Sequence, residues 1–323
     1  KVRLAMPMTA RWCETYVFSA SLREIDLEGR IIEPTLSLLN SLSRTRSSTL
    51  GSLGTRCQDA GRACRIAIVW SGMHTDLLDH PLITERYFFP RLAPLADPVW
   101  VETGGERLAC WHAPAAAGQK TLVHFHGNGE VVADYLPDYA RAIAESGVGV
   151  FLAEYRGYGG STGIPQLGKM LGDVEPVYRT LGLEARQLVV YGRSVGALFA
   201  VELVSRYPQI AGLILESGVA DVLQRLQVRM SAQELGVSES ELAATVAARL
   251  DHQAKLQDYQ GRLLVLHARD DDLVTPDHAQ LHLDWAGTVH KELVWFERGG
   301  HNGLLAANFP AYLQALQGFL QML

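Results

Sequence analysis

Short apolar runs alternate with amphipathic helical repeats from about residue 81 to the end of the chain. Apolar runs of strand length, several of them rich in β-branched residues, occur at 121–126, 148–155, 188–191, 210–215, 263–267 and 292–296. Helical spacing of apolar residues occurs at 132–146, 169–181, 197–207 and 309–323. This alternation predicts βα units, and hence a mostly parallel sheet with helices on both faces.

Two further strand-like runs precede these units, at 99–102 and 108–111. Gly104-Gly105 lies between them, which predicts a hairpin. The two antiparallel strands of this hairpin bring the predicted sheet to eight strands.

The segment 218–260 interrupts the alternation, because it is helical, mixed in charge and without a strand run. Its predicted helices are 222–230 and 239–250. An insertion at this point lies over the carboxyl ends of the strands, where ligands bind in open α/β sheets. We therefore expect a small helical cap that presents Leu226 and Met230 to a substrate. The alternative is an extra pair of surface helices.

Residues 1–80 lack the periodicity of residues 81–323, and we interpret them as an N-terminal extension. The part from 35 to 65 is rich in Ser, Thr, Leu, Gly and Arg, and Asp59 is its only acid. A partly ordered extension, a transit-like segment and sequence upstream of the natural start all remain open. None of the candidate chemistry lies in this segment.

Composition narrows the classes of partner. A net charge of −6 and a pI near 6.0 argue against nucleic acid and anionic membrane surfaces. No apolar stretch approaches the ~20 residues of a membrane-spanning helix. The four cysteines, at 13, 57, 64 and 110, include no C-x-x-C pair. We expect free thiols and a cytoplasmic protein, with a Cys57–Cys64 bridge as the alternative for an exported one. The sequence leaves the oligomeric state unknown.

The segment Gly192–Gly196 reads Gly-Arg-Ser-Val-Gly and joins a strand run to a helical repeat. This G-x-S-x-G pattern in a strand–turn–helix setting exposes the serine hydroxyl at the positive end of a helix. Its glycines relieve crowding on a strained turn. Ser194 is therefore the candidate nucleophile. Gly159–Gly163 matches the same pattern, but Ile164-Pro165 follows it instead of a helix, so we expect Ser161 to be a loop residue.

A serine hydroxyl needs a base to take its proton and a carboxylate to orient that base. His301 follows the last strand run after two glycines, and is the candidate base. The acid is one of Asp270, Asp271 and Asp272, which follow the preceding strand run, while the others face solvent or cap the next helix. Glu216, at the end of an earlier strand run, is the fallback acid.

An oxyanion hole needs two backbone N–H groups. Val195, directly after the candidate nucleophile, supplies one of them. Gly127 and Gly129 let the loop after the 121–126 run fold inward, so the N–H of Asn128 is the second candidate.

Two histidine pairs have spacings that suggest metal ligands, His124 with His126 and His278 with His282. Neither pair has a third ligand at a suitable spacing, and the aspartates at 270–272 lack the spacing of an EF-hand. We therefore expect no metal site.

Taken in order, these motifs resemble the α/β-hydrolase superfamily, in particular ABHD-type serine hydrolases with an H-G-N loop. The matching stretches are 126–128, 154–159, 192–196, 267–274 and 300–301, within about residues 85–323. The resemblance implies an α/β-hydrolase fold and no cofactor. The family pattern H-x-x-x-D-x-x-V, laid on His267 and Val274, implies Asp271 as the acid. Glu154 stands where relatives commonly carry aspartate, at a position that is usually structural, and Ser194 excludes the relatives with an aspartate nucleophile.

We therefore expect a serine hydrolase that cleaves a small-molecule carboxylic ester through an acyl-enzyme intermediate. The alternatives are a thioesterase or amidase with the same triad, and a non-catalytic ligand-binding protein on this fold. A peptidase usually carries a large gating domain, and residues 1–80 are too few and too irregular for one. The acyl and alcohol groups of the substrate cannot be read from the sequence.

Overall fold

A computed structural model describes residues 76–323 of the protein. The predictions for the N-terminal extension up to residue 75, including the alternative Cys57–Cys64 bridge, lie outside these residues. The described part begins with a short 3-10 helix, η2 (Leu77–Asp79), whose Leu78 is fully buried.

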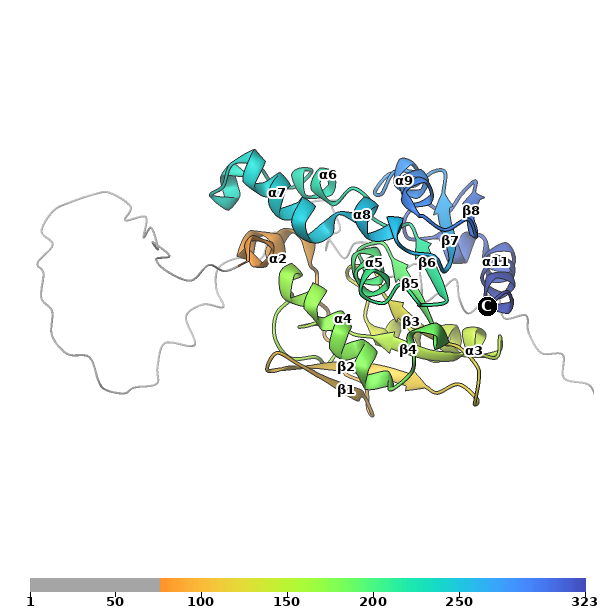
Figure 1. The fold of residues 1–323 in the computed structure, drawn as a ribbon. Helices are drawn as coiled ribbons and strands as arrows, with labels where there is room; N and C mark the ends of the chain where they lie inside the picture. Colours follow the sequence, from red (N-terminus) through yellow and green to blue (C-terminus); the bar gives the residue numbers. More distant parts are fainter. Residues whose placement is uncertain (1–75) are drawn as a thin grey trace, which may run out of the picture. The chain divides into compact units, whose positions relative to one another are not determined.

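Eight strands form one sheet in the order β1-β2-β4-β3-β5-β6-β7-β8 (Figure 1). The strands are β1 (Val99–Thr103), β2 (Glu106–Ala113), β3 (Thr121–Phe125), β4 (Gly149–Ala153), β5 (Leu188–Arg193), β6 (Gly212–Glu216), β7 (Arg262–Ala268) and β8 (Lys291–Phe296). β1, β2 and β4 pair antiparallel, and every other pairing is parallel. The predicted hairpin and the predicted mostly parallel sheet of eight strands are confirmed.

Helices cover both faces of the sheet (Figure 1). One layer contains α4 (Leu167–Leu181), α5 (Gly196–Arg206), α8 (His252–Gln257) and α9 (Asp277–Trp285), which contact one another in that order. The other contains α3 (Asp138–Ala144) and α11 (Phe309–Gln321). Alternate residues of the central strands belong to the two cores, as Val123 and Leu122 do in β3. The central strands are buried on both faces, which explains their continuous apolar runs.

The helix predicted over 132–146 is divided into a 3-10 turn, η3 (Val132–Tyr135), and α3. Pro137 separates them, because proline disfavours helical geometry at the preceding residue. Leu136 is accordingly extended, with φ −111° and ψ 142°.

The segment between β6 and β7 contains helices and no strand, as predicted. It contains α6 (Val222–Gln227), a 3-10 turn η5 (Gln233–Leu235), α7 (Glu239–Leu250) and α8. α8 packs on α5 and α9, so it belongs to the helical layer, and α6 and α7 remain as the candidate cap. The sequence pattern did not predict two short helices, α2 (Pro81–Tyr87) and α10 (Leu304–Ala307). Within residues 76–323, no helix combines the length and apolarity needed to cross a bilayer.

Candidate active site

The turn between β5 and α5 holds Ser194 in a left-handed conformation, with φ +53°. Residues other than glycine rarely adopt this backbone conformation, so the turn is strained. A Cβ on Gly192 would lie 2.7 Å from the Cβ of Ala200, and one on Gly196 would lie 2.1 Å from the carbonyl oxygen of Phe125. Both neighbours are therefore glycine because β5, β3 and α5 approach so closely that no side chain fits.

Ser194, His301 and Asp271 form a hydrogen-bonded chain. His301 Nε2 lies 2.8 Å from Ser194 Oγ, and His301 Nδ1 lies 2.9 Å from Asp271 Oδ2. All three residues are buried, with exposed fractions of 8%, 7% and 3%. The sequence-predicted nucleophile, base and acid are thus brought together from the ends of β5, β8 and β7.

Asp271 is held in place by backbone donors as well as by His301. Its Oδ1 accepts the N–H groups of Leu273 and Val274 at 3.0 and 2.9 Å. Burial acts to raise the pKa of Asp271, but the hydrogen bond and charge of His301 and the N–H of Val274 outweigh it, and the pKa is lowered. The carboxylate therefore stays ionised beside the imidazole.

The other candidate acids have different partners. Asp270 accepts the N–H groups of Gly299 and Gly300 at 3.3 and 2.7 Å, so it holds the loop that carries His301. Asp272 is exposed. Asp270 is exposed as well, as predicted for the aspartates that flank the acid, and in addition it binds the loop that carries His301.

Glu216, the fallback acid, belongs to a separate buried cluster. Its Oε2 accepts the Tyr312 hydroxyl at 2.7 Å and the Tyr191 hydroxyl, and its Oε1 lies 3.3 Å from Arg193 Nε. None of its contacts is with His301, so its role in the described residues is structural.

Ser161 lies in a loop, as predicted. Its Oγ accepts the N–H of Ala109 at 2.9 Å, and its own N–H donates to the carbonyl of Tyr158 at 2.8 Å. Among residues 76–323, no histidine contacts this hydroxyl. The second G-x-S-x-G match therefore fixes a loop against β2.

Asn128 and Val195, the predicted oxyanion-hole residues, line the same cavity as Ser194. Neither backbone N–H donates to another group in the described part of the chain. The side chain of Asn128, in contrast, is fully engaged: its Nδ2 donates to the Tyr87 carbonyl at 2.5 Å, and its Oδ1 accepts from the Phe89 N–H at 3.0 Å and the Tyr158 hydroxyl at 2.8 Å. The side chain fixes the loop and leaves the backbone donor free.

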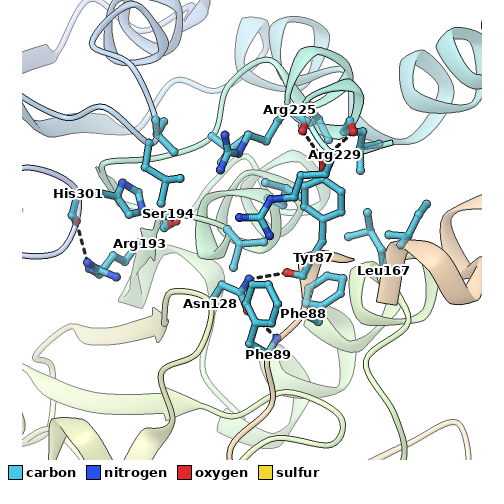
Figure 2. A pocket seen from close by; sticks show the side chains of 18 of the residues that line it. Tyr87, Phe88, Phe89, Asn128, Leu167, Arg193, Ser194, Arg225, Arg229 and His301 are labelled. Carbon is cyan, nitrogen blue, oxygen red and sulfur yellow. Dashed lines mark hydrogen bonds between the residues drawn. The ribbon is translucent and has the colours of Figure 1, made fainter. Parts of the chain in front are cut away.

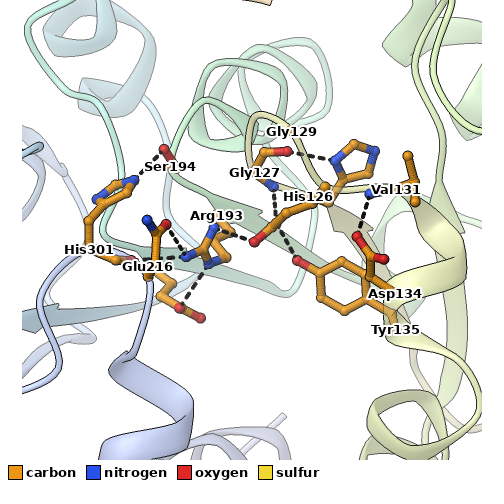
Figure 3. Close-up of polar contacts among 12 residues, drawn as sticks. His126, Gly127, Gly129, Val131, Asp134, Tyr135, Arg193, Ser194, Glu216 and His301 are labelled. Carbon is orange, nitrogen blue, oxygen red and sulfur yellow. Dashed lines mark hydrogen bonds and ion pairs between the residues drawn. The ribbon is translucent and has the colours of Figure 1, made fainter. Parts of the chain in front are cut away.

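Arg193, which sequence reasoning passed over, joins three parts of the site (Figure 3). Its Nη2 donates to the His301 carbonyl at 2.9 Å, its Nη1 to Glu130 Oε1 at 2.5 Å, and its Nε contacts Glu216. The second oxygen of Glu130 accepts the N–H of Gly127 at 2.6 Å. Burial acts to raise the pKa of Glu130, but the charge of Arg193 and further hydrogen bonds lower it. One guanidinium thus ties the histidine loop to the loop of Asn128.

In the first histidine pair considered as metal ligands, His126 makes two polar contacts and His124 makes ring contacts only. His126 Nδ1 contacts the Gly127 carbonyl at 2.8 Å and its Nε2 contacts Glu154 at 2.7 Å. Burial opposes the protonation of His126, but the Glu154 charge and hydrogen bond prevail and raise its pKa. His124 instead packs among the rings of three tyrosines, namely Tyr135, Tyr139 and Tyr191.

The second pair, His278 and His282, lies on the buried side of α9. His278 Nδ1 accepts the N–H groups of Ala220 and Asp221 at 3.0 and 3.2 Å, so that nitrogen carries no proton. Burial lowers the pKa of His282 to about 3. Within the described ranges, no three histidine, cysteine, aspartate or glutamate side chains form a group suited to a metal ion.

A cavity of about 210 Å³ opens beside Ser194 and His301 (Figure 2). Most of its lining residues are apolar, and those from α2, α4, α5, α6 and the residue after α2 include Ile83, Phe88, Leu167, Leu198, Val222 and Leu226. Leu226 therefore lies where we expect a substrate-binding residue. Met230 does not line the cavity; it follows the end of α6 and packs into the core, so its sequence-based assignment is corrected.

The contribution of α2 to the cavity wall was not predicted. Residues up to 80 were expected to lie outside the domain, and no helix or strand was predicted for 81–98. The Tyr87 hydroxyl lies 2.5 and 2.6 Å from the carbonyl oxygens of Arg225 and Leu226, and so joins α2 to α6. Pro81 at the start of α2, after His80, is the one local signal of a helix there.

Comparisons with known proteins find similar hydrolases. The family model described as serine aminopeptidase, S33, matches residues 116–250. Alpha/beta hydrolase domain-containing protein 17C of Xenopus laevis is 24% identical over 228 residues, which are 68% of this chain and 68% of that protein. The human domain-containing protein 17B of the same series is 24% identical over 221 residues, 67% of this chain and 72% of that protein.

Two solved structures illustrate the likeness in fold. Est1E from Butyrivibrio proteoclasticus, solved with ferulic acid bound, has a TM-score of 0.57 at 14% identity, covering 69% of this chain and 98% of that one. The Pyrococcus furiosus esterase Pf2001 has a TM-score of 0.56 at 17% identity, covering 73% of this chain and 98% of that one. At such identities the likeness concerns the fold.

Proposed function

Because the chain is an ABHD-type member of the α/β-hydrolase superfamily, we propose that it is a serine hydrolase that cleaves carboxylic esters through an acyl-enzyme intermediate. Hydrolase chemistry follows from the family. The observation that supports the serine mechanism is the buried chain Ser194–His301–Asp271, with contacts of 2.8 and 2.9 Å. These are the hydrogen bonds that a nucleophile, its base and an orienting acid require.

In the first half-reaction, Ser194 Oγ attacks the ester carbonyl while His301 Nε2 takes the hydroxyl proton. Asp271 fixes the ring so that Nδ1 carries a proton and Nε2 is free to accept one. Its ionised carboxylate then stabilises the imidazolium that forms. The imidazolium returns the proton to the departing alkoxide, which leaves as an alcohol, and the acyl group remains on Ser194.

The negative charge on the carbonyl oxygen needs preorganised donors. The N–H groups of Asn128 and Val195 are free for this purpose in the described residues. Val195 also stands at the positive end of α5, which favours an anion there. In the second half-reaction, His301 takes a proton from water, the hydroxide attacks the acyl-enzyme, and the proton passes to Ser194 as the acid departs.

The wall of the cavity favours an ester over an N-terminal peptide as substrate. A free amino terminus carries a positive charge, which an acidic side chain would have to meet. Of the described residues that line the cavity none is acidic, whereas three are arginines. The same triad would also cleave thioesters or amides. Adding one thioester and one amide to the ester panel distinguishes these three activities.

The test is labelling with a fluorophosphonate probe together with hydrolysis of p-nitrophenyl esters from acetate to palmitate. We expect Ser194-dependent labelling and turnover of at least one ester. The matched control is Ser161→Ala, a serine in the same sequence pattern outside the site. Absence of labelling in a folded wild-type protein would favour a non-catalytic ligand-binding protein instead.

A further inference from the structure

Two arginines of the candidate cap line the cavity beside the nucleophile. Arg225 lies within α6 and Arg229 just after it, and Figure 2 shows both side chains reaching toward the space beside Ser194 and His301. The rest of the wall is mostly apolar. Guanidinium groups in such a setting need an explanation, because an apolar ester gains nothing from them.

Arg225 has no anionic partner among the described residues. Its guanidinium makes no hydrogen bond and no ion pair within the 76–323 range. Only its backbone carbonyl is engaged, by the Tyr87 hydroxyl. Burial, followed by the nearby charge of Arg229, lowers the pKa of Arg225, and the weaker attraction of Asp271 does not offset this. The group is therefore a partly desolvated cation without a counter-ion.

Arg229 is held in position but keeps donors to spare. Its guanidinium lies 5.5 Å from the ring centroids of both Tyr87 and Phe89. Its Nη1 donates to the Arg86 carbonyl at 2.7 Å, and Arg86 returns a bond to the Arg229 carbonyl at 2.8 Å. An arginine has five N–H donors, so most of them remain for a ligand. The aromatic stacking orients a planar group ready for bidentate binding.

Arg193 provides the internal contrast. It also lines the cavity, but its donors go to Glu130, Glu216 and the carbonyl of His301. Arg86 likewise has a carboxylate partner, Glu234, at 2.8 Å. The two cap arginines differ from both in lacking any carboxylate within bonding distance in the described part of the protein.

We propose that Arg225 and Arg229 form a subsite for an anionic group of the substrate, a carboxylate or a phosphate carried by the ester that Ser194 cleaves. This deepens the proposed function and rests on it. Guanidinium forks match both oxyanions, and charge-assisted hydrogen bonds of this kind are stronger than neutral ones. The enzyme therefore selects esters that carry a negative charge at a distance from the scissile bond.

Two matched substrate pairs test the subsite. The mono-p-nitrophenyl ester of glutarate and p-nitrophenyl pentanoate share a five-carbon acyl chain and differ by an anionic carboxylate on the acyl side. Octanoyl glycerol phosphate and octanoyl glycerol differ by a phosphate on the alcohol side. We expect kcat/KM to favour the anionic member of one pair by about 10- to 100-fold. Raising ionic strength from about 20 mM to about 0.5 M should shrink that preference several-fold.

The variant Arg225→Met keeps an apolar stem of similar length and removes the charge. We expect it to lower kcat/KM for the anionic ester about 10- to 100-fold more than kcat/KM for the neutral ester of the same pair. Arg229→Met should act in the same direction. The matched control is Arg179→Met, whose side chain is 75% exposed on α4 and paired with Glu175. Thermal melting checks that each variant is folded, and the salt series on the wild type needs no variant.

The outcomes separate the two proposals. If Ser194-dependent hydrolysis occurs and neither pair shows a preference for the anion, the subsite is wrong and the serine hydrolase stands. A preference that survives in the Arg225→Met and Arg229→Met double variant also overturns the subsite. If none of the four esters is cleaved, or if Ser194→Ala cleaves them as the wild type does, the proposed function fails and the subsite fails with it.

Discussion

Two segments of this chain share the pattern G-x-S-x-G and put their serines to different uses. Ser194 sits on a strained turn with φ +53°, and its hydroxyl meets His301. Ser161 lies in a loop, and its hydroxyl meets a backbone N–H of β2. The five residues therefore do not make the site. What makes it is the strand and helix on either side, which set the backbone angle and aim the hydroxyl at another strand's loop.

The glycines differ for the same reason. Gly192 and Gly196 leave room for α5 and β3 against the turn. A Cβ on Gly159 would instead lie 2.3 Å from a carboxylate oxygen of Glu154, a structural partner of His126. Glycines in the same sequence pattern thus make room for different neighbours, namely a helix and a strand at Ser194 and a carboxylate side chain at Ser161.

The largest expected effect separates the two serines. Ser194→Ala should lower kcat by a factor on the order of 10⁴ to 10⁶ and abolish fluorophosphonate labelling, because the nucleophile is gone. Ser161→Ala should keep most of the activity. Steady-state kinetics and gel-based labelling measure both, and an inactive, folded Ser161→Ala enzyme would reverse the comparison.

The next effect separates two neighbouring aspartates. Asp271→Asn should lower kcat by about 10⁴, because an amide favours the wrong imidazole tautomer. Asp270→Asn should cost far less, since its partners are the N–H groups of Gly299 and Gly300 and an amide oxygen still accepts from them. Kinetics on one ester at a fixed pH suffices. Equal losses in the two variants would show that the loop, and not the tautomer, limits the reaction.

A smaller effect is expected at Arg193, the last residue of β5, compared with Arg206 at the end of α5. Arg193→Lys keeps a charge beside Glu130 but loses the fork that also reaches the His301 carbonyl. We expect kcat to fall about 10- to 100-fold, with the rate of probe labelling falling in parallel. Arg206→Lys, whose arginine pairs with Glu202, is the control. A change in melting temperature without a change in kcat would make Arg193 purely structural.

The pH dependence of stability is expected to differ between a buried and an exposed histidine. His282 has a pKa lowered to about 3 by burial, and its ring nitrogens have no partner in the described residues. An unfolded histidine titrates near 6.5, so the unfolded chain binds that proton first. The contribution of His282 to stability is therefore present above about pH 6.5 and lost as pH falls toward 3, by up to about 1.4 kcal/mol per pH unit.

Urea unfolding at several pH values between about 7.5 and 4.5 measures this slope. His282→Leu should flatten it, whereas His290→Leu, at an exposed position, should not. An unchanged slope in His282→Leu would assign the acid sensitivity to other buried groups.

The smallest effect separates two apolar residues at the cap. Leu226 lines the cavity, so Leu226→Ala should change the preference for acyl chain length by a few-fold. Met230 is buried in the core, so Met230→Ala should lower the free energy of unfolding by about 2–5 kcal/mol and leave the preference alone. The p-nitrophenyl ester panel and urea unfolding distinguish them. Uniform rate losses in Leu226→Ala would indicate a stability effect instead.

Much of this molecule was predictable because its signals are local. Apolar runs and helical repeats fix strands and helices within a few residues, and the glycines of the Ser194 turn follow from its own backbone. His301 was predicted as the base from its place after the last strand. The identification of Asp271 needed a family pattern, because three adjacent aspartates are equivalent until the loop folds.

The sequence by itself determined the order of elements, the strand–turn–helix at Ser194 and the loops that end β3, β7 and β8. Only the tertiary structure decided what those loops meet. Arg193 reaches residues 63 and 108 positions away, and Arg86 bonds to a carbonyl 143 positions away. Such contacts depend on how packed layers bring distant segments together, and no local pattern encodes a distance of that kind. The packing of α2 against α6 therefore decides that Arg225 and Arg229 form a charged pair in a mostly apolar cavity, which no local sequence pattern predicts.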